Sequence, residues 1–172
     1  MFTKSGYSAS SVNEIAREVG ITQTGVLHHF AGGKIALLRA VLEQRDVRAE
    51  DILAGAHGRD FLVGLVEISR TQASLRGAVQ LYTILSAEAT NPEHPAHEYF
   101  VGRFTRITDA VTVAFTEVQE AGGLREGVDA RRAALDIVAA TEGLELLWLY
   151  GVDVDMVADI RHRINGFLTS PL

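Results

Sequence analysis

The sequence contains no cysteine, only three prolines and no long apolar run. Without cysteine the fold cannot depend on disulfide bonds, which persist mainly in oxidising compartments. A membrane-spanning helix needs roughly 20 consecutive apolar residues, and no such stretch occurs. The first residues also lack the basic segment and apolar stretch of a secretory signal peptide. These absences predict a cytoplasmic protein with no membrane span.

Negative charge predominates, but it is unevenly distributed along the 172 residues. The net charge of −6 argues against a protein that coats nucleic acid over its whole surface. Residues 1–48 nevertheless contain six Lys and Arg against four Asp and Glu, whereas residues 49–172 contain ten against eighteen. This asymmetry suits a protein whose contact with a polyanion is confined to its N-terminal end.

Helical periodicity dominates the chain. Proline occurs only at positions 92, 95 and 171, and apolar residues recur three or four apart in almost every long segment. We therefore predict an all-α protein. Asp129 and Asp153 stand where N-caps of the last two helices belong. Beyond residue 57 the expected helices cover about 59–73, 75–89, 96–121, 129–150 and 154–168.

The segment SSVNEIAREVG has the features of a helix with defined ends. Ser11 and Glu14 have the spacing of a capping box, and Gly20 suits a left-handed C-terminal cap. One apolar stripe is expected to face the core and consists of Val12, Ile15, Ala16 and Val19.

A second, very short helix is expected over about residues 23–30, with Thr22 as its N-cap. A helix of this length is not stable without its neighbour. Val26 and Phe30 lie four positions apart and can pack against the preceding helix. The polar residues on the opposite face are Gln23, Thr24 and His28.

A third helix is expected from about Lys34 to about Gly55. Its apolar residues fall on two faces, so it should have neighbours on two sides. One face holds Ile35, Leu38 and Leu42, and the other holds Leu37 and Val41. We place the boundary between a small N-terminal domain, residues 1–47, and a larger helical domain, residues 48–172, within this third helix.

Two helices joined by a tight turn, with a short second helix, form the pattern of a helix-turn-helix. Its free polar face has suitable chemistry, because Gln can bond adenine edges, Thr can contact a thymine methyl and His can donate to phosphate or base. The alternative interpretation is a polar surface helix that contacts only water.

The stretch GYSASSVNEIAREVGITQTGVLHHFAGGKIALLRAVL resembles the DNA-binding domain of the TetR family of bacterial transcriptional regulators. The resemblance covers about forty residues. The matching positions are Ser10, Ser11, Ile15, Ala16, Gly20, Thr22, Gly25, His29, Phe30 and Lys34.

The resemblance implies that the short helix enters the major groove of operator DNA. It assigns base contacts to Gln23, Thr24, Leu27 and His28. It assigns phosphate contacts to Ser11, Thr22, His29 and Lys34. For His29, a capping residue packed under the next turn is the alternative.

Two departures from the family pattern stand out. Leu27 occupies a position where the family usually has tyrosine, and leucine can supply only apolar contact. The family also places a complete helix before the Gly-Tyr pair, whereas only MFTKS precedes Gly6 here. We therefore expect that the printed chain lacks the beginning of its first helix.

The last two helices carry more apolar surface than one packed face requires, above all between Leu144 and Tyr150. Pairing with a second copy in a four-helix interface accounts for this excess, and the resemblance also implies a homodimer. A monomer with a buried central helix is the alternative. The predicted interface consists of Leu135, Val138, Glu142, Gly143, Leu146, Ile160, Ile164 and Phe167.

The middle helices carry large apolar residues at helical spacing, which more often form a core than a ligand site. The resemblance implies that they surround a small, largely apolar effector. Glu142 and Glu145 are costly inside an apolar helix unless each faces solvent, a partner subunit or a polar ligand group. The predicted pocket consists of Phe61, Leu65, Ile68, Tyr82, Thr83, Phe100, Arg103, Phe104, Ile107, Glu145 and Trp148.

Catalysis and metal binding find little support. His94 and His97 invite a metal site, but they flank a proline-broken helix start where capping is the ordinary role. No phosphate-binding loop and no catalytic triad spacing is present, so we predict no enzyme, no catalytic residue and no cofactor.

The sequence favours a ligand-responsive repressor that binds a palindromic operator. The alternative is a small-molecule-binding helical protein that has lost DNA recognition.

Overall fold

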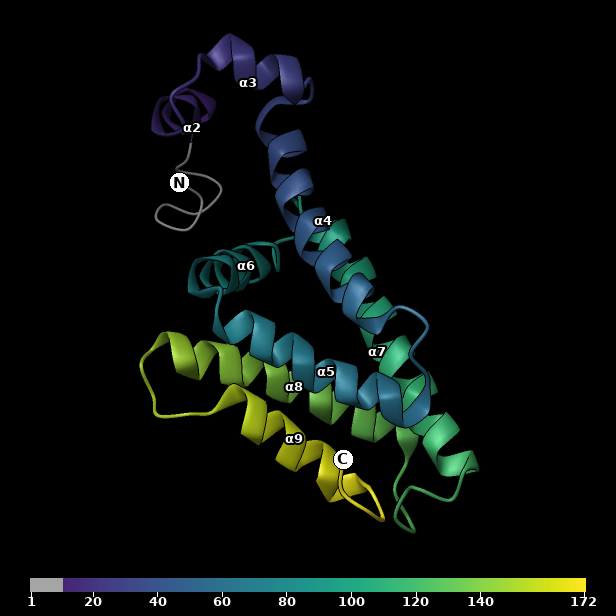
Figure 1. Cartoon of the computed structure of the whole chain (residues 1–172). Coiled ribbons are helices and arrows are strands. Elements are labelled where there is room, and N and C mark those ends of the chain that lie inside the picture. Colours follow the sequence, from purple (N-terminus) through teal and green to yellow (C-terminus); the bar gives the residue numbers. More distant parts are fainter. Residues whose placement is uncertain (1–10) are drawn as a thin grey trace. The chain divides into compact units, whose positions relative to one another are not determined.

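The computed structural model describes residues 11–172, and within that range every regular element is a helix. The predicted all-α class is therefore confirmed (Figure 1). The family-like Gly6, Tyr7 and Ser10, and the expected remnant of a first helix, lie outside the described residues. The helices are α2 Val12–Glu18, α3 Gln23–His29, α4 Gly33–Leu53, α5 Gly58–Ala73, α6 Arg76–Glu88, α7 His97–Glu120, α8 Ala130–Leu149 and α9 Met156–Phe167.

The chain forms two compact units that are each described separately. The first comprises Met1–Arg48 with Gly77–Phe100, and the second comprises Ala49–Arg76 with Val101–Leu172. The helices α4 and α7 thus contribute residues to both units. The division after Arg48 lies next to the predicted domain boundary, but the sequence did not indicate that residues 77–100 group with the N-terminal part.

The predicted caps of α2 and α3 are confirmed. Ser11 accepts a hydrogen bond from the Glu14 amide at 3.2 Å and its own amide donates to Glu14 Oε2 at 3.0 Å, which completes a capping box. Gly20 has φ of 74°, a left-handed conformation that glycine adopts without steric cost. Thr22 Oγ1 accepts from the Gly25 amide at 3.0 Å. Each cap satisfies main-chain donors or acceptors that a helix end leaves free.

Two positions in the N-terminal helices differ from the predicted apolar faces. Val19 is 62% exposed because α2 ends at Glu18, so Val19 follows the last helical turn instead of extending the buried stripe. Ile35 is also exposed, whereas Leu38 and Leu42 on α4 are buried.

The remainder of the first unit joins α4, α6 and the start of α7. Tyr82 and Phe100 are both buried, and their ring centroids are 5.2 Å apart. The Tyr99 hydroxyl donates to Asp46 Oδ2 at 2.6 Å, which ties the first turn of α7 to α4. An aromatic cluster and the hydrogen bonds of the Tyr99 hydroxyl to Asp46 and to the Leu42 carbonyl oxygen therefore hold these three helices together.

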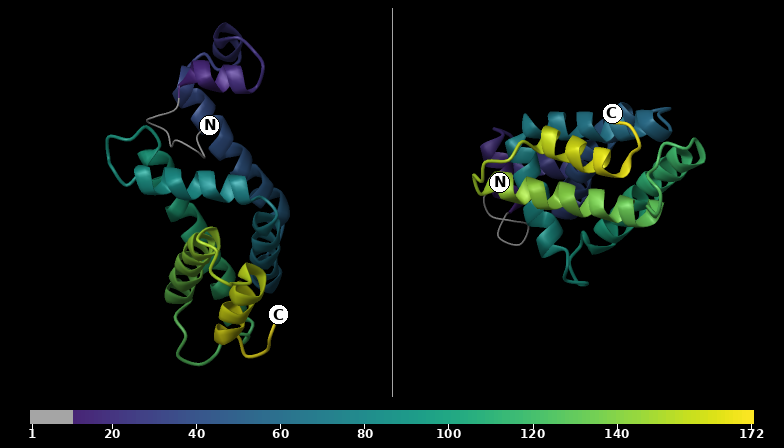
Figure 2. Two further views of the ribbon diagram at one scale, coloured as in Figure 1. Left: turned by 90° about the vertical axis from the view of Figure 1, so that its left-hand side faces the viewer. Right: turned by 90° about the horizontal axis from the view of Figure 1, so that it is seen from below.

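The second unit is built around a core shared by α5, α7, α8 and α9. Helix α9 packs against both α5 and α8, and α8 and α9 lie side by side in Figures 1 and 2. The Phe115 and Phe167 rings meet edge to face at 5.8 Å. Other buried core residues include Leu62, Val66, Ile137, Ile160 and Ile164.

The caps of the last two helices confirm one prediction and correct another. Asp129 caps α8 by accepting from the Arg132 amide at 2.8 Å, as expected. Helix α9 is capped by Asp155, whose Oδ1 accepts from the Val157 and Ala158 amides, both at 3.0 Å. Asp153 was the wrong choice, because a capping carboxylate must directly precede the first helical residue to reach these amides. None of the helices described is both long and apolar enough to cross a membrane.

His94 and His97 bind main-chain groups of the turn between α6 and α7. His94 Nδ1 accepts from the Ala96 amide at 3.2 Å, and His97 Nδ1 lies 2.8 Å from the Ala89 carbonyl oxygen. The side chain of His94 is 7% exposed. Burial lowers the pKa of His94 from its ordinary value, although the Glu88 carboxylate at 3.9 Å acts in the opposite direction.

The lowered pKa of His94 makes stability depend on pH. In the unfolded chain His94 takes up a proton near pH 6.5, whereas in the folded protein it does so only at a lower pH. The neutral form of His94 therefore contributes its full stability above pH 6.5, and this contribution is lost as the pH falls toward the pKa of the folded state. We expect the free energy of unfolding in urea to fall more steeply from pH 7.5 to pH 5.5 in the wild type than in His94→Asn. Asparagine keeps an acceptor for the Ala96 amide but does not titrate.

The matched control for this comparison is His28→Asn, at an exposed histidine, which should leave the pH dependence of the wild type unchanged. Equal slopes for the wild type and His94→Asn would contradict the assignment.

Candidate nucleic-acid interface

Helix α3 presents one face to the protein and one to solvent. Val26 is its buried residue, and α2 packs directly against α3. Phe30, the second predicted anchor, is half-buried. All four predicted base-contacting residues are exposed, namely Gln23, Thr24, Leu27 and His28. The arrangement leaves hydrogen-bonding groups and one apolar side chain free to meet base edges, although their contact with DNA remains a prediction.

The turn into α3 depends on a glycine. A Cβ atom at Gly25 would lie 3.3 Å from Thr22 Oγ1, which is closer than most side-chain contacts allow. The absence of a side chain at Gly25 therefore leaves room for the Thr22 cap. While it accepts from the Gly25 amide, the Thr22 hydroxyl can still donate its own proton, and a phosphate oxygen is a suitable acceptor.

The four predicted phosphate-contacting residues differ in their exposure to solvent and in the hydrogen bonds that they already make. Thr22 and His29 are exposed, and the rings of His28 and His29 meet edge to face at 5.7 Å. Lys34 is half-buried in the first turn of α4. Ser11 is the weakest candidate, because its hydroxyl donates to Glu14 Oε2 at 2.8 Å. That hydrogen bond lowers the pKa of Glu14, whose carboxylate is ionised at neutral pH with or without this shift, and the negative charge beside Ser11 repels phosphate.

The predicted effector residues are divided between the two units. Tyr82, Thr83 and Phe100 belong to the first unit. In the second unit Leu65 is part of the core, and several members pack against that core: Phe61, Ile68, Ile107 and Trp148. Phe104 is half-buried there. A shared effector pocket therefore stays a prediction.

Two charged members of this set are deeply buried. Glu145 on α8 is 1% exposed and Arg103 on α7 is 9% exposed, both within the second unit. Burying an ionised group is costly unless other groups compensate for the lost water. These two residues are the charged side chains that the described part of the helical body buries.

The predicted dimer surface on α8 and α9 needs one correction. Ile160 and Ile164 lie in the core of the subunit, because they face α5 and α8 and are at most 1% exposed. Leu135, Gly143 and Leu146 are exposed, as a dimer interface requires, whereas Val138, Glu142 and Phe167 are half-buried. Sequence reasoning could not separate these groups, because all but Glu142 are apolar or small residues at helical spacing.

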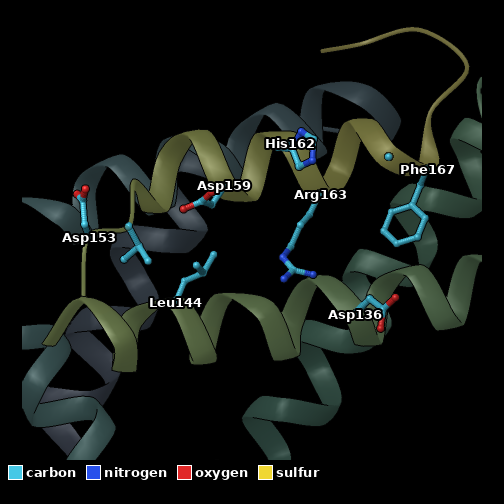
Figure 3. Close-up of a pocket in the computed structure, with 9 residues that line it drawn as sticks. Asp136, Leu144, Asp153, Asp159, His162, Arg163 and Phe167 are labelled. Carbon is cyan, nitrogen blue, oxygen red and sulfur yellow. The ribbon is translucent and has the colours of Figure 1, made fainter. Parts of the chain in front are cut away.

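Sequence reasoning missed a groove between α8 and α9. Figure 3 shows the groove, which has a volume of about 620 Å³. Its lining residues are Asp136, Leu144, Asp153, Val154, Asp159, His162, Arg163, Gly166 and Phe167. The only sequence signal was the three polar positions 159, 162 and 163 on one side of α9.

Comparison with known proteins finds one family model that matches the N-terminal residues. Residues 1–41 match the family described as bacterial regulatory proteins, tetR family. No curated protein matches the chain.

Solved structures share the fold over nearly the whole chain. A TetR-family transcriptional regulator from Rhodococcus sp. is 20% identical, with a TM-score of 0.77 over 98% of this chain and 92% of that one. A regulator from Saccharomonospora viridis, solved in complex with choline, is 24% identical, with a TM-score of 0.73 over 96% and 88%. A ketosteroid transcriptional regulator of Mycobacterium tuberculosis is 22% identical, with a TM-score of 0.70 over 99% and 90%. At these identities the likeness shows the fold.

Lys34 offers a direct test of the phosphate contacts. Lys34→Ala should weaken binding to duplex DNA, because fewer counterions are released when fewer phosphates are neutralised. The slope of log affinity against log salt should become shallower by about 0.9 for each phosphate that the variant no longer neutralises. Affinities measured by fluorescence anisotropy from low to moderate salt would give the slopes of the wild type and the variant.

Arg48→Ala is the matched control, since Arg48 is an exposed cation about 21 Å further along α4. An unchanged slope in Lys34→Ala would remove Lys34 from the phosphate contacts.

Proposed function

We propose that this chain is a DNA-binding transcriptional regulator of the tetR family and that it acts as a repressor, which a small effector releases from a palindromic operator. The observation that carries the proposal is the outward face of α3, where four side chains able to contact base edges are exposed beside the buried Val26. The seven residues of α3 are enough to place these groups in a major groove.

Specific recognition further requires two α3 helices at a set distance. Half-sites one helical turn apart on DNA are separated by about 34–36 Å, and a homodimer with a two-fold axis supplies two such helices. Helix α8 supports this assembly, since an exposed stripe runs along it with apolar or small residues three or four positions apart. The stripe consists of Leu135, Ala139, Gly143, Leu146 and Tyr150.

The buried charges of the helical body support an effector with a polar group. Glu145 and Arg103 are charged side chains buried in the second unit, and a ligand that places a polar group beside them while burying its own apolar surface would gain affinity from both effects. A solved structure supports this proposal, since the Saccharomonospora viridis regulator was solved in complex with choline. We infer an effector with a largely apolar body and at least one charged or hydrogen-bonding group.

Release of the protein from its operator requires that the effector binds the conformation with low DNA affinity better than the conformation that binds DNA. Helices α4 and α7 suit this coupling because each contributes residues to both compact units. The bond from Tyr99 to Asp46 joins these two helices within the first unit. A shift of α7 on effector binding would therefore move α4, which leads directly to α3, and change the separation of the two α3 helices.

One observation favours a second candidate function. Leu27 is exposed on α3 where the resemblance implies tyrosine, so the hydroxyl that would contact the DNA backbone is missing. A small-molecule-binding protein that has lost DNA recognition would keep the helical body and lose operator affinity.

An electrophoretic shift of the DNA upstream of the protein's own gene separates these candidates. We expect a complex that resists excess non-specific DNA and is dissociated by the small molecules that mass spectrometry finds retained by the purified protein. Gln23→Ala should reduce discrimination against a mutated site by about 1–3 kcal/mol, because base contacts carry specificity. Gln44→Ala, at an exposed glutamine on α4, is the control. Retained ligand without any specific shift would favour the second candidate.

The dimer has its own test. Leu146 is 43% exposed within the stripe, and Leu146→Arg would place a charge in the centre of the proposed interface. We expect the dimer dissociation constant in sedimentation velocity to rise at least about thirtyfold, the equivalent of about 2 kcal/mol for a central interface residue.

Val113→Arg, at an exposed valine on α7, should leave the dimer intact. Equal dissociation constants for the two variants would place the interface elsewhere.

A further inference from the structure

The turn that joins α6 to α7 contains two histidines whose ring nitrogens have opposite roles. His94 Nδ1 accepts a hydrogen bond from the Ala96 amide at 3.2 Å. His97 Nδ1 lies 2.8 Å from the Ala89 carbonyl oxygen, which can only accept, so this nitrogen carries a proton and donates. A second proton on the His97 ring would occupy Nε2 and leave that bond intact. On His94 the second proton would occupy Nδ1, and the Ala96 amide would lose its acceptor.

The surroundings of His94 favour its neutral form. The side chain is 7% exposed, and within residues 11–172 the charged group that acts on the ring is Glu88 of α6, whose Oε2 lies 3.9 Å from Nε2. Burial lowers the pKa of His94 more than this carboxylate raises it. Glu93 in the turn and Glu98 in α7 are exposed to solvent. The folded turn therefore holds a neutral ring, and acid is needed to add the second proton.

The amide that His94 binds belongs to the start of α7. Ala96 directly precedes this helix and is 2% exposed, so water cannot replace the lost acceptor unless the turn opens. Three residues further on, the Tyr99 hydroxyl donates to Asp46 Oδ2 of α4 at 2.6 Å and lies 3.3 Å from the Leu42 carbonyl oxygen. All of these residues belong to the first compact unit, which also contains α3. Protonation of His94 therefore acts on the turn that carries the attachment of α7 to α4.

We propose that His94 is a proton-dependent positioning residue for DNA binding, because its neutral ring caps the start of α7 and Tyr99 in that turn holds α4, which leads to α3. The inference rests on the DNA binding in the proposed function and adds a response to acid. A proton at Nδ1 removes the cap, frees the Tyr99 hydroxyl from α4 and leaves α3 on a less fixed support. The held arrangement binds fewer protons than the released one, so DNA affinity falls as the pH falls.

The ordinary pKa of histidine, 6.5, bounds the size of this response. At pH 5.5 a freely titrating ring is protonated about ten times more often than it is neutral, whereas at pH 7.5 it is almost always neutral. Between these two pH values one His94 can therefore weaken the held arrangement by at most about tenfold in each copy of the chain. We expect its share of the loss in DNA affinity to be at least about threefold.

The same substitution at the two histidines provides a matched test. In His94→Asn the amide oxygen can still accept from Ala96, and in His97→Asn the amide nitrogen can still donate to Ala89, so each variant keeps its bond and loses one titrating ring. Fluorescence anisotropy at constant ionic strength would measure affinity for a labelled duplex of the DNA upstream of the protein's own gene. From pH 7.5 to pH 5.5, the wild type and His97→Asn should both lose at least about threefold more affinity than His94→Asn. Exposed histidines such as His28 titrate alike in all three proteins and cancel from this comparison.

Tyr99→Phe tests the route from His94 to α4. This variant keeps an aromatic ring and loses the hydroxyl that bonds Asp46 and Leu42. The additional pH dependence should be absent in Tyr99→Phe, and His94→Asn in that background should change nothing further, because residues that act through one contact are not additive. An additional pH dependence of wild-type size in Tyr99→Phe would overturn this route.

Hydrogen exchange without DNA separates this inference from the proposed function. At pH 5.5 the amides of residues 42–46 and 97–100 should exchange at least about threefold faster in the wild type than in His94→Asn, and at pH 7.5 the two proteins should match. A comparison at one pH cancels the direct effect of pH on exchange, and the match at pH 7.5 also shows that the variant is folded.

Each outcome decides one of the two claims. Equal exchange at pH 5.5, or an equal loss of DNA affinity in the wild type and His94→Asn, overturns the role of His94 and leaves the proposed function in place. Faster exchange in the wild type without a specific DNA complex at either pH overturns the proposed function and leaves the acid-dependent release of α4.

Discussion

The proposed DNA contacts depend on the packing of a helix that could not exist alone. Helix α3 has seven residues, far fewer than an isolated helix needs in water. The caps at Ser11 and Thr22, the left-handed Gly20 and the burial of Ala16 and Val26 hold α2 and α3 together. Every outward side chain of α3 takes its direction from that packing. Removal of the Val26 anchor would therefore affect all four candidate base contacts together.

The helical body combines two kinds of surface that a soluble monomer would not ordinarily leave to water. One is the stripe on α8, where Leu135, Leu146 and Tyr150 are between 43% and 81% exposed. The other is the groove beside it, where charges of both signs have no partner in their own subunit within the described residues. In the proposed homodimer a two-fold axis would bring the stripe of one copy against that of the other and cover its apolar surface.

Predictions that depend only on neighbouring residues, such as the helix caps, were largely confirmed. Capping at Ser11, Thr22 and Asp129 depends on residues within one turn of a helix end, and these predictions are confirmed. The cap of α9 was misplaced by two residues, from Asp155 to Asp153, because two aspartates precede the same apolar run. Val19 was expected to be buried on periodicity alone, but α2 ends one residue earlier. Boundaries of this kind depend on small energy differences that the spacing of apolar residues does not encode.

The sequence by itself determined the all-helical class, the helix-turn-helix and the outward polar set of α3, because capping, periodicity and a short glycine turn act over a few neighbouring residues. Only the tertiary structure decided that Ile160 and Ile164 face the core while Leu146 faces solvent. It also gathered five titratable side chains from α8, α9 and the loop between them along one groove. An apolar pattern states which residues avoid water, but the packing of distant helices decides whether the subunit or a second copy covers them.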